Sequence, residues 1–234
     1  MDDVLNVDIL KEFNKFGRVW GTRPGEFESP FMVTPKEFIQ YAEANLNENT
    51  PHGLLDCLSN TKRAIECQMD SLLMFLGLYD IAKKKNLGFP SKAEMLNKAG
   101  IISPRILIKI NKTRNLMEHS YEIPEKEKVE DSLDAAYLFV LSTEKYLSIS
   151  TYAFDIENDL QEDEIENEKP LYDGSYSIKL DPELRTLFIK SNIFLFSETY
   201  EGRQEIEKEI VFDSDEYYDY LKIYVQLYDL VGIR

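Results

Sequence analysis

The sequence predicts a mainly α protein, in which an antiparallel helical bundle is followed by a smaller C-terminal α+β appendage. Apolar residues recur at helical spacing through most of the first 155 residues, an acidic stretch follows, and apolar and polar residues alternate in the C-terminal part. We therefore expect a helical domain at 1–155, an acidic linker at 156–170 and a small α+β domain at 171–234.

The first expected elements are a short amphipathic segment at 4–16 and a loop rich in glycine and proline that extends to residue 30. A helix start follows at 34–37, where the sequence Thr-Pro-Lys-Glu forms a capping box with proline in the first helical position. A polar turn at 45–53 should end this helix.

The middle of the chain predicts four more helices. A long central helix is expected at about 58–83, where apolar residues recur every three or four positions. A second capping box at 91–94 starts a short helix that stops at Gly100. Serine and proline at 103–104 open a further helix, and another long helix is expected at 124–152.

The C-terminal part predicts three or four strands, at about 176–180, 187–196 and 205–212. The acidic run at 213–216 then caps a final helix that carries several tyrosines. These aromatic side chains could form a partner surface, but filling the core of a thin sheet is the better interpretation.

Charge is distributed unevenly along the chain. The net charge of −16 argues at first sight against nucleic acid, but residues 155–234 contribute 21 acidic and only 8 basic side chains. Residues 81–114, in contrast, contain nine basic side chains and one acidic side chain. This basic segment is either an ordinary solvated lysine face or a surface that attracts RNA.

Scarcity of histidine and cysteine limits the chemistry that the chain can perform. With two of each, we expect no metal site and no cofactor. Cys57 and Cys67 lie about 15 Å apart along one predicted helix, so they cannot form a disulfide and should be buried thiols of a reducing compartment. His52, in the polar turn, should be incidental.

Because no apolar run approaches the roughly 18 residues of a membrane span, we expect a cytoplasmic protein without membrane contact.

The most informative pattern is R-x4-H-x-Y at 114–121, formed by Arg114, His119 and Tyr121, with Asn115 directly after the arginine. An imidazole with a pKa of about 6.5 transfers protons near neutral pH, and a guanidinium fits the oxygens of a phosphate. These groups can cleave a phosphodiester without a metal. Alternatively, Arg114 and His119 only close the C-terminal end of a helix.

This pattern resembles the signature of the HEPN superfamily, the all-helical domains of many prokaryotic RNase toxins and defence proteins. The resemblance covers about residues 35–155 and, outside the motif, concerns the order of helices. It implies a metal-independent ribonuclease in which His119 moves the proton of the attacking 2′-hydroxyl and Arg114 holds the phosphate oxygens. Asn115 would orient the site, and Tyr121 would position the RNA backbone or the histidine.

The spacing of the motif also bears on the assembly. Five positions along a regular helix turn His119 about 140° away from Arg114, so one undistorted helix cannot present both side chains to one phosphate. The resemblance implies a homodimer whose two motifs face each other across a two-fold axis. The predicted RNA-binding residues are Arg105, Lys109 and Lys112. They share one face of the motif helix, which differs from the face that carries Arg114.

Two other functions remain open. The first is a non-catalytic HEPN module for dimerisation or for binding a protein or nucleotide, which the acidic composition and Glu118 beside His119 mildly favour. The second is a toxin–antitoxin component whose partner is an antitoxin or a nucleotidyltransferase that modifies Tyr121, as the resemblance allows.

Overall fold

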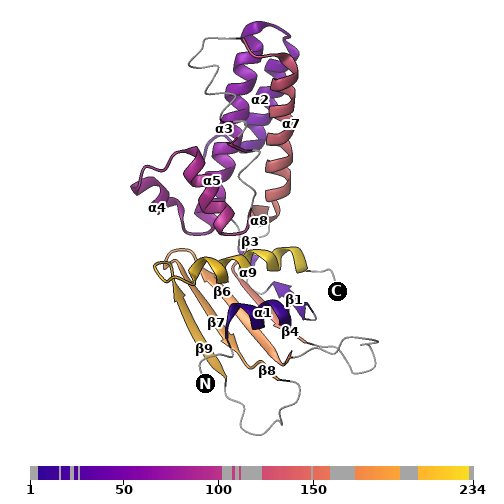
Figure 1. Ribbon diagram of the computed structural model, residues 1–234. Helices are drawn as coiled ribbons and strands as arrows, with labels where there is room; N and C mark the ends of the chain where they lie inside the picture. The colour runs from indigo at the N-terminus through magenta and orange to yellow at the C-terminus, as the bar shows by residue number, and fades with distance from the viewer. Residues whose placement is uncertain are drawn as a thin grey trace, which may run out of the picture. The chain divides into compact units, whose positions relative to one another are not determined.

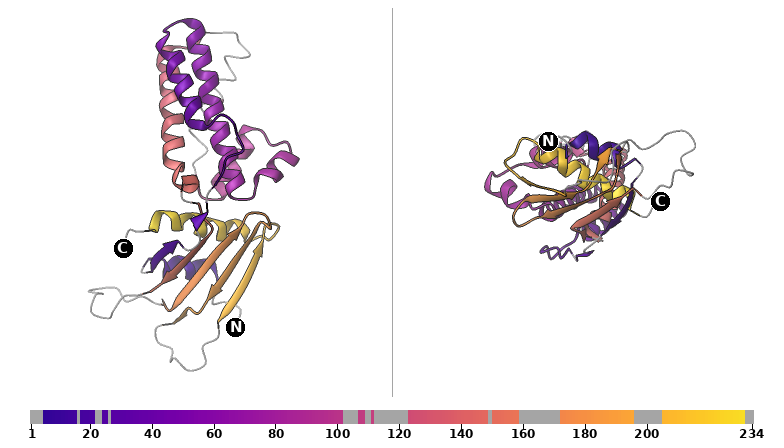
Figure 2. Two further views of the ribbon diagram at one scale, coloured as in Figure 1. Left: turned by 180° about the vertical axis from the view of Figure 1, so that it is seen from behind. Right: turned by 90° about the horizontal axis from the view of Figure 1, so that it is seen from below.

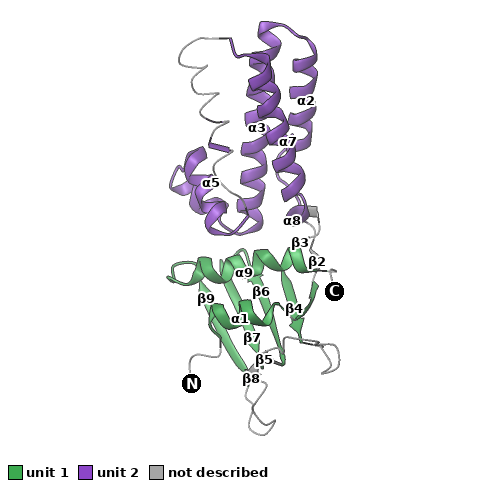
Figure 3. Cartoon of the chain, turned by 45° about the vertical axis from the view of Figure 1, so that its right-hand side comes forward, with its two compact units in different colours: residues 1–25, 149–234 green, residues 26–148 purple. Residues whose placement is uncertain are grey.

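The protein consists of two compact units, one of which is inserted into the other. The computed structural model describes residues 5–15, 17–21, 24–25, 27–101, 107–108, 111, 123–148, 150–158, 172–195 and 205–231. The α/β unit comprises Met1–Gly25 and Ile149–Arg234, and the helical unit comprises Glu26–Ser148 (Figure 3). The helical unit is therefore an insertion in the chain of the α/β unit.

The α/β unit is built on an antiparallel sheet of five strands in the order β1-β4-β6-β7-β9 (Figure 1). The strands are β1 (Arg18–Gly21), β4 (Ala153–Glu157), β6 (Ser175–Asp181), β7 (Thr186–Ser191) and β9 (Ile206–Val211). Two short antiparallel pairs accompany the sheet: β2 (Pro24–Gly25) with β3 (Ser150–Thr151), and β5 (Tyr172–Asp173) with β8 (Phe194–Leu195). The prediction of a mainly α protein is therefore wrong, and the fold is α+β.

One face of the sheet is covered by two helices, α1 (Val7–Phe13) and α9 (Tyr217–Leu230). Buried side chains alternate along β6, as the sequence predicted, and the matching positions of the neighbouring strands are buried as well. The tyrosines of α9 contribute to this core, which confirms their predicted role: Tyr217, Tyr220 and Tyr224 are fully buried, and Tyr218 and Tyr228 are partly buried. The opposite face, turned to the viewer in the left view of Figure 2, is not covered by any helix of the described α/β unit.

The N-terminal segment belongs to the sheet rather than to the helical domain in which the sequence placed it. The expected loop at 17–30 contains β1, which pairs with β4 so that Val19 lies opposite Ile156. Gly17 allows this close approach, because a Cβ atom there would lie 2.6 Å from Cγ2 of Ile156. The predicted linker at 156–170 also differs from the structure, because its first two residues belong to β4, which ends at Glu157. Residues 159–170 of this linker lie outside the described residues.

The helical unit is centred on three packed helices, α2 (Pro35–Asn47), α3 (Pro51–Phe75) and α7 (Lys126–Thr143). Three shorter helices complete its described part: α4 (Tyr79–Lys84), α5 (Phe89–Lys98) and α8 (Lys145–Ser148). Nζ of Lys126 donates to Oδ1 of Asn49 at 3.1 Å, and Lys36 forms an ion pair with Glu144. Because these contacts join opposite ends of α2 and α7, the two helices run antiparallel, and α7 runs parallel to α3.

Helix ends follow the local sequence in some places and depart from it in others. The capping box at 34–37 is confirmed, with both of its hydrogen bonds formed. The expected helix at 58–83 is two helices, because Gly77 has a φ of 71° and ends α3 in a left-handed turn. The second predicted capping box is not used, since α5 begins at Phe89 after Gly88. The expected helix at 124–152 ends earlier, where β3 begins.

Candidate functional site

The predicted site lies outside the part of the chain that the structure describes. This holds for all four predicted catalytic residues, Arg114, Asn115, His119 and Tyr121. It also holds for the three predicted RNA-binding residues, Arg105, Lys109 and Lys112. Their roles and their mutual placement therefore stay predictions, and what can be described is the scaffold on either side of them.

Three residues just before the motif are described and helical: Leu107, Ile108 and Asn111. Leu107 and Asn111 are buried, with exposed fractions of 1% and 8%. Four positions separate them, so they lie on one side of a helix and this side faces the core. On the other side of the motif, α7 begins at Lys126 and packs along α2 and α3.

Five of the nine basic residues in segment 81–114 are described, and they differ in exposure. Lys83, Lys84, Lys85 and Lys98 are exposed. Lys92 instead forms an ion pair with Asp70, with 2.6 Å between Nζ and Oδ1, and both side chains are less than one fifth exposed. Lys92 is therefore neutralised within the unit, and the other four lysines hold their charges at its surface.

The other candidate reactive groups are surface or core positions. His52 lies in the first turn of α3 rather than in a loop, and its 81% exposed side chain places Nε2 3.3 Å from Oδ2 of Asp56. Cys57 and Cys67 both lie on α3, as predicted. Burial raises the pKa of both thiols to about 11, so both are protonated at neutral pH and are poor nucleophiles.

The described residues bring together no group of three or more histidine, cysteine or acidic side chains that could hold a metal ion. Nor does any described helix combine the length and apolar character needed to cross a membrane.

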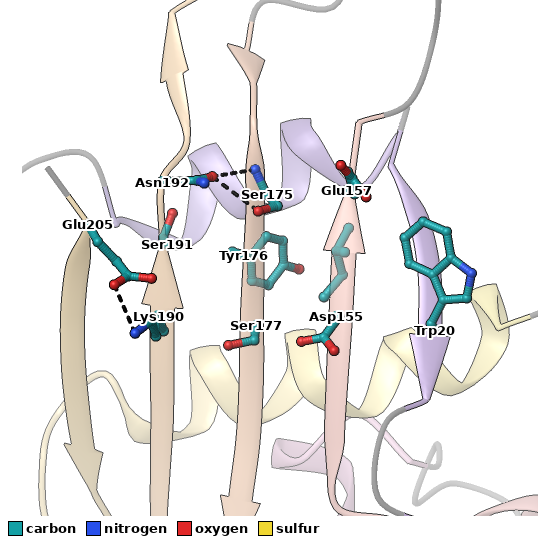
Figure 4. A pocket seen from close by; sticks show the side chains of 11 residues that line it. Trp20, Asp155, Glu157, Ser175, Tyr176, Ser177, Lys190, Ser191, Asn192 and Glu205 are labelled. Atoms are coloured by element: carbon teal, nitrogen blue, oxygen red, sulfur yellow. Dashed lines mark hydrogen bonds and ion pairs between the residues drawn. The ribbon is translucent and has the colours of Figure 1, made fainter. Parts of the chain in front are cut away.

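Sequence reasoning missed a polar surface on the open face of the sheet. The strand register aligns Trp20, Asp155, Ser177, Lys190 and Glu207 in one row across all five strands. Figure 4 shows four of these side chains around a hollow of about 270 Å³, on the side of the sheet away from the helices. The alternation within 176–180 was visible in the sequence, but the pairing that adds Trp20 was not.

One cluster of charges on this open face is paired across the strands. Nζ of Lys190 lies 2.8 Å from Oε2 of Glu205 and 3.3 Å from Oε1 of Glu207. Nζ of Lys179 lies 5.6 Å from the ring centre of Phe188. Such cross-strand pairs are typical of a solvated sheet face, and no pair of nucleophile and base is found among the described residues there.

A second hollow, of about 270 Å³, lies between α2 and α7. Ile39 lines it on α2, and Tyr137, Val140 and Leu141 line it on α7. The ion pair between Lys36 and Glu144 joins the two helices at the same place. The walls are mainly apolar, so this groove suits the side chains of a protein partner better than a phosphate.

No family model matches the chain, and searches of curated proteins and of solved structures found no match either.

Proposed function

We propose that this protein is a metal-independent endoribonuclease of the HEPN type that acts in the cytoplasm as a homodimer, in a toxin or phage-defence system. The observation that carries the proposal is the R-x4-H-x-Y pattern of Arg114, His119 and Tyr121, with Asn115 beside the arginine. Support also comes from the four exposed lysines of segment 81–114, which add positive charge near the motif in sequence.

In the proposed reaction, the 2′-oxygen of the substrate attacks the adjacent phosphorus, and the bond from phosphorus to the 5′-oxygen breaks. The products are a 2′,3′-cyclic phosphate and a free 5′-hydroxyl, so no water and no metal take part in this step. His119 moves the proton, and Arg114 stabilises the charge that develops on the non-bridging oxygens. Asn115 orients the site, and Tyr121 positions the backbone or the imidazole.

The residues that surround the motif in sequence have auxiliary roles in this proposal. Arg105, Lys109 and Lys112 bind the RNA backbone through their positive charges. Arg114 and His119 come from different copies of the chain, because their spacing along one helix separates them by about 140°. The described thiols of Cys57 and Cys67 take no part, since both are protonated at neutral pH.

The test is incubation of the purified protein with total cellular RNA in excess EDTA, followed by a denaturing gel. We expect cleavage by the wild type, loss of cleavage in His119→Ala, and unchanged cleavage in His52→Ala, the matched control at the other histidine. A DNA oligonucleotide incubated in the same way should stay intact because it lacks the attacking 2′-hydroxyl. Intact RNA with the wild type, or equal cleavage by His119→Ala, contradicts the catalytic assignment.

A second candidate is a HEPN module that binds a protein or nucleotide without turnover. The net charge of −16 and the carboxylate of Glu118 next to His119 favour it, because both disfavour a bound phosphate. A related form is a toxin held inactive by an antitoxin or by a nucleotidyltransferase that modifies Tyr121. The intact mass of protein from its native host distinguishes the forms, since a nucleotide adduct that maps to Tyr121 supports the modified toxin.

A further inference from the structure

One side of α7 is left exposed and combines acidic with apolar side chains. We name Asp131, Asp134, Leu138 and Leu141 the α7 face. All four residues are exposed, and the two leucines expose 62% and 53% of their surfaces. Spacings of three, four and three positions keep the four on one side of the helix, and the buried residues of α7 lie on the opposite side. The core of the helical unit therefore does not use the α7 face.

The α7 face has two chemically different halves. Two carboxylates stand in the half nearer the start of the helix, and two leucines stand in the half nearer its end. Ten positions separate Asp131 from Leu141, which corresponds to about 15 Å along the axis. A partner that covers the whole face must therefore extend over about three helical turns, and it must match carboxylates at one end and apolar side chains at the other.

A groove beside the apolar half widens this surface. Helices α2 and α7 lie side by side (Figure 1), and Tyr137 and Leu141 line the hollow of about 270 Å³ between them. The side chain of Tyr137 is 50% exposed. Scattered exposed leucines need no explanation, but here three neighbouring apolar side chains are exposed at the rim of a hollow. Apolar side chains of a partner can therefore pack on Leu138 and enter the groove.

The carboxylates at this surface are not neutralised within the described part of the protein. Asp131, Asp134 and Glu43, which lines the groove from α2, have no hydrogen-bond or ion-pair partner among the residues that the structure describes. The three lysines of α2 and α7 are already engaged by other carboxylates: Lys36 by Glu144, Lys126 by Glu130 and Lys128 by Glu125. The surface therefore retains negative charge and complements a positively charged partner.

A second copy of this chain fits the α7 face poorly. In an antiparallel pair in register, Asp131 would face Leu141 and Asp134 would face Leu138, so each carboxylate would be buried against a leucine. A parallel pair would place like carboxylates opposite each other, which is repulsive. The complementary occupant is therefore a helix of a different protein, whose basic and apolar residues follow the order of this face.

We propose that the α7 face and the adjoining groove bind an amphipathic basic helix of a partner protein. Apolar side chains of that helix pack on Leu138 and Leu141, and its lysine or arginine side chains pair with Asp131 and Asp134. The mode is that of a helix laid along a hydrophobic groove, in which apolar residues at helical spacing are the anchors. The contact goes beyond the proposed ribonuclease, because it uses residues outside the motif and requires no RNA.

The first test measures the binding of a fluorescent probe peptide to the full-length protein by anisotropy. The probe is an amphipathic helix of about 14 residues, with leucines at helical spacing and lysines elsewhere, and its counterpart has glutamate in place of lysine. We expect the leucine–lysine peptide to bind and the leucine–glutamate peptide not to bind. Leu138→Lys should weaken the binding about tenfold or more. Absence of binding by the leucine–lysine peptide overturns the proposal.

Leu184→Lys is the matched control, since Leu184 is a leucine of similar exposure, 65%, in the turn between β6 and β7. An equal loss of peptide binding in both variants would show that the net charge of −16 alone attracts the peptide, and it overturns the proposal. Light scattering should give the same mass for free Leu138→Lys and free wild type. A smaller mass for Leu138→Lys would show that a second copy covers the α7 face, which also overturns the proposal.

The second test reverses the charges of the α7 face. The double variant of Asp131→Lys and Asp134→Lys should lose the leucine–lysine peptide and gain the leucine–glutamate peptide, because the new lysines attract its carboxylates. The matched control is the double variant of Asp213→Lys and Asp215→Lys, two exposed acids of the α/β unit with the same change of charge, which should gain nothing. Binding of the leucine–glutamate peptide by both double variants equally, or by neither, overturns the proposal. RNA cleavage is not part of either readout, so a failed ribonuclease assay leaves this result unaffected.

Discussion

The helical unit and the α/β unit acquire their structures in different ways. In the helical unit, α2 and α3 are joined by only three residues and pack directly on each other. In the α/β unit, the edge strand β1 pairs with β4, so that Arg18 lies opposite Glu157 and the whole helical unit intervenes in the sequence. The hairpin of α2 and α3 therefore forms from segments that are neighbours in the sequence, whereas the sheet depends on pairing between distant segments.

The two units also differ in charge. The helical unit, residues 26–148, contains 18 acidic and 15 basic side chains, a net charge of −3. The α/β unit, residues 1–25 and 149–234, contains 25 acidic and 12 basic side chains, a net charge of −13. An RNA substrate should therefore meet less repulsion at the helical unit, which is also the unit that contains the motif.

The largest expected change is removal of the whole insertion. Gly25 pairs with Ser150 across β2 and β3, so the two ends of the insertion leave the α/β unit side by side. We expect the α/β unit to fold when residues 26–148 are replaced by a linker of about four glycine and serine residues. Circular dichroism and the fluorescence of Trp20, the single tryptophan, report the result. An unfolded shortened chain would show that the sheet needs the helical unit.

Next in size are substitutions in the two cores. Ile178 in β6 and Leu72 in α3 are both fully buried. Each change to alanine should lower the stability of its own unit by about 2–5 kcal/mol, because it removes packed atoms and leaves a cavity. Thermal unfolding followed by Trp20 fluorescence should shift with Ile178→Ala and stay unchanged with Leu72→Ala. Equal shifts with both substitutions would show that the units unfold as one.

A smaller loss of stability is expected at the contact between β1 and β4. Gly17→Ala should destabilise the α/β unit by about 1–3 kcal/mol, because the added Cβ would overlap the side chain of Ile156. Gly88→Ala is the matched control in the helical unit, since the nearest atom to its added Cβ is Cδ of Pro90 at 4.0 Å. Denaturant unfolding should therefore separate the two variants, and equal midpoints would contradict the close approach at β1.

The smallest effect is expected at the start of α2. Thr34→Ala should cost the helical unit about 1 kcal/mol, because the side chain of Thr34 accepts a hydrogen bond from the backbone N–H of Glu37. Ser91→Ala should cost less, since Ser91 is not the residue that caps α5. Thermal unfolding near neutral pH provides the measurement, and an equal loss in the two variants would contradict the difference between the two helix starts.

The contribution of the capping box should also depend on pH. Hydrogen bonds from the backbone and side chain of Thr34 lower the pKa of the Glu37 carboxyl below its ordinary value of 4.5. A lowered folded-state pKa stabilises the fold above the ordinary value and loses this contribution as pH falls through the lowered value. The difference between wild type and Thr34→Ala should therefore shrink in strongly acidic solution, and a difference that grows there would contradict this linkage.

The sequence by itself determined the features that depend on neighbouring residues. The capping box at 34–37, the alternation at 176–180 and the buried tyrosines of the last helix all follow from local hydrogen bonding and periodicity. The R-x4-H-x-Y pattern and the unequal charge are likewise properties of the sequence alone. They motivate the ribonuclease proposal without any structural contact.

Only the tertiary structure decided which segments belong together. The glycine-rich segment before Gly21 reads locally as a loop, yet it becomes an edge strand because β4, far away in the sequence, offers its free backbone groups. The acidic residues at 155 and 157 looked like part of a linker and instead alternate on the open face of a strand. Strand pairing joins residues that no local window contains, and for this reason the α+β fold and the insertion became visible only in three dimensions.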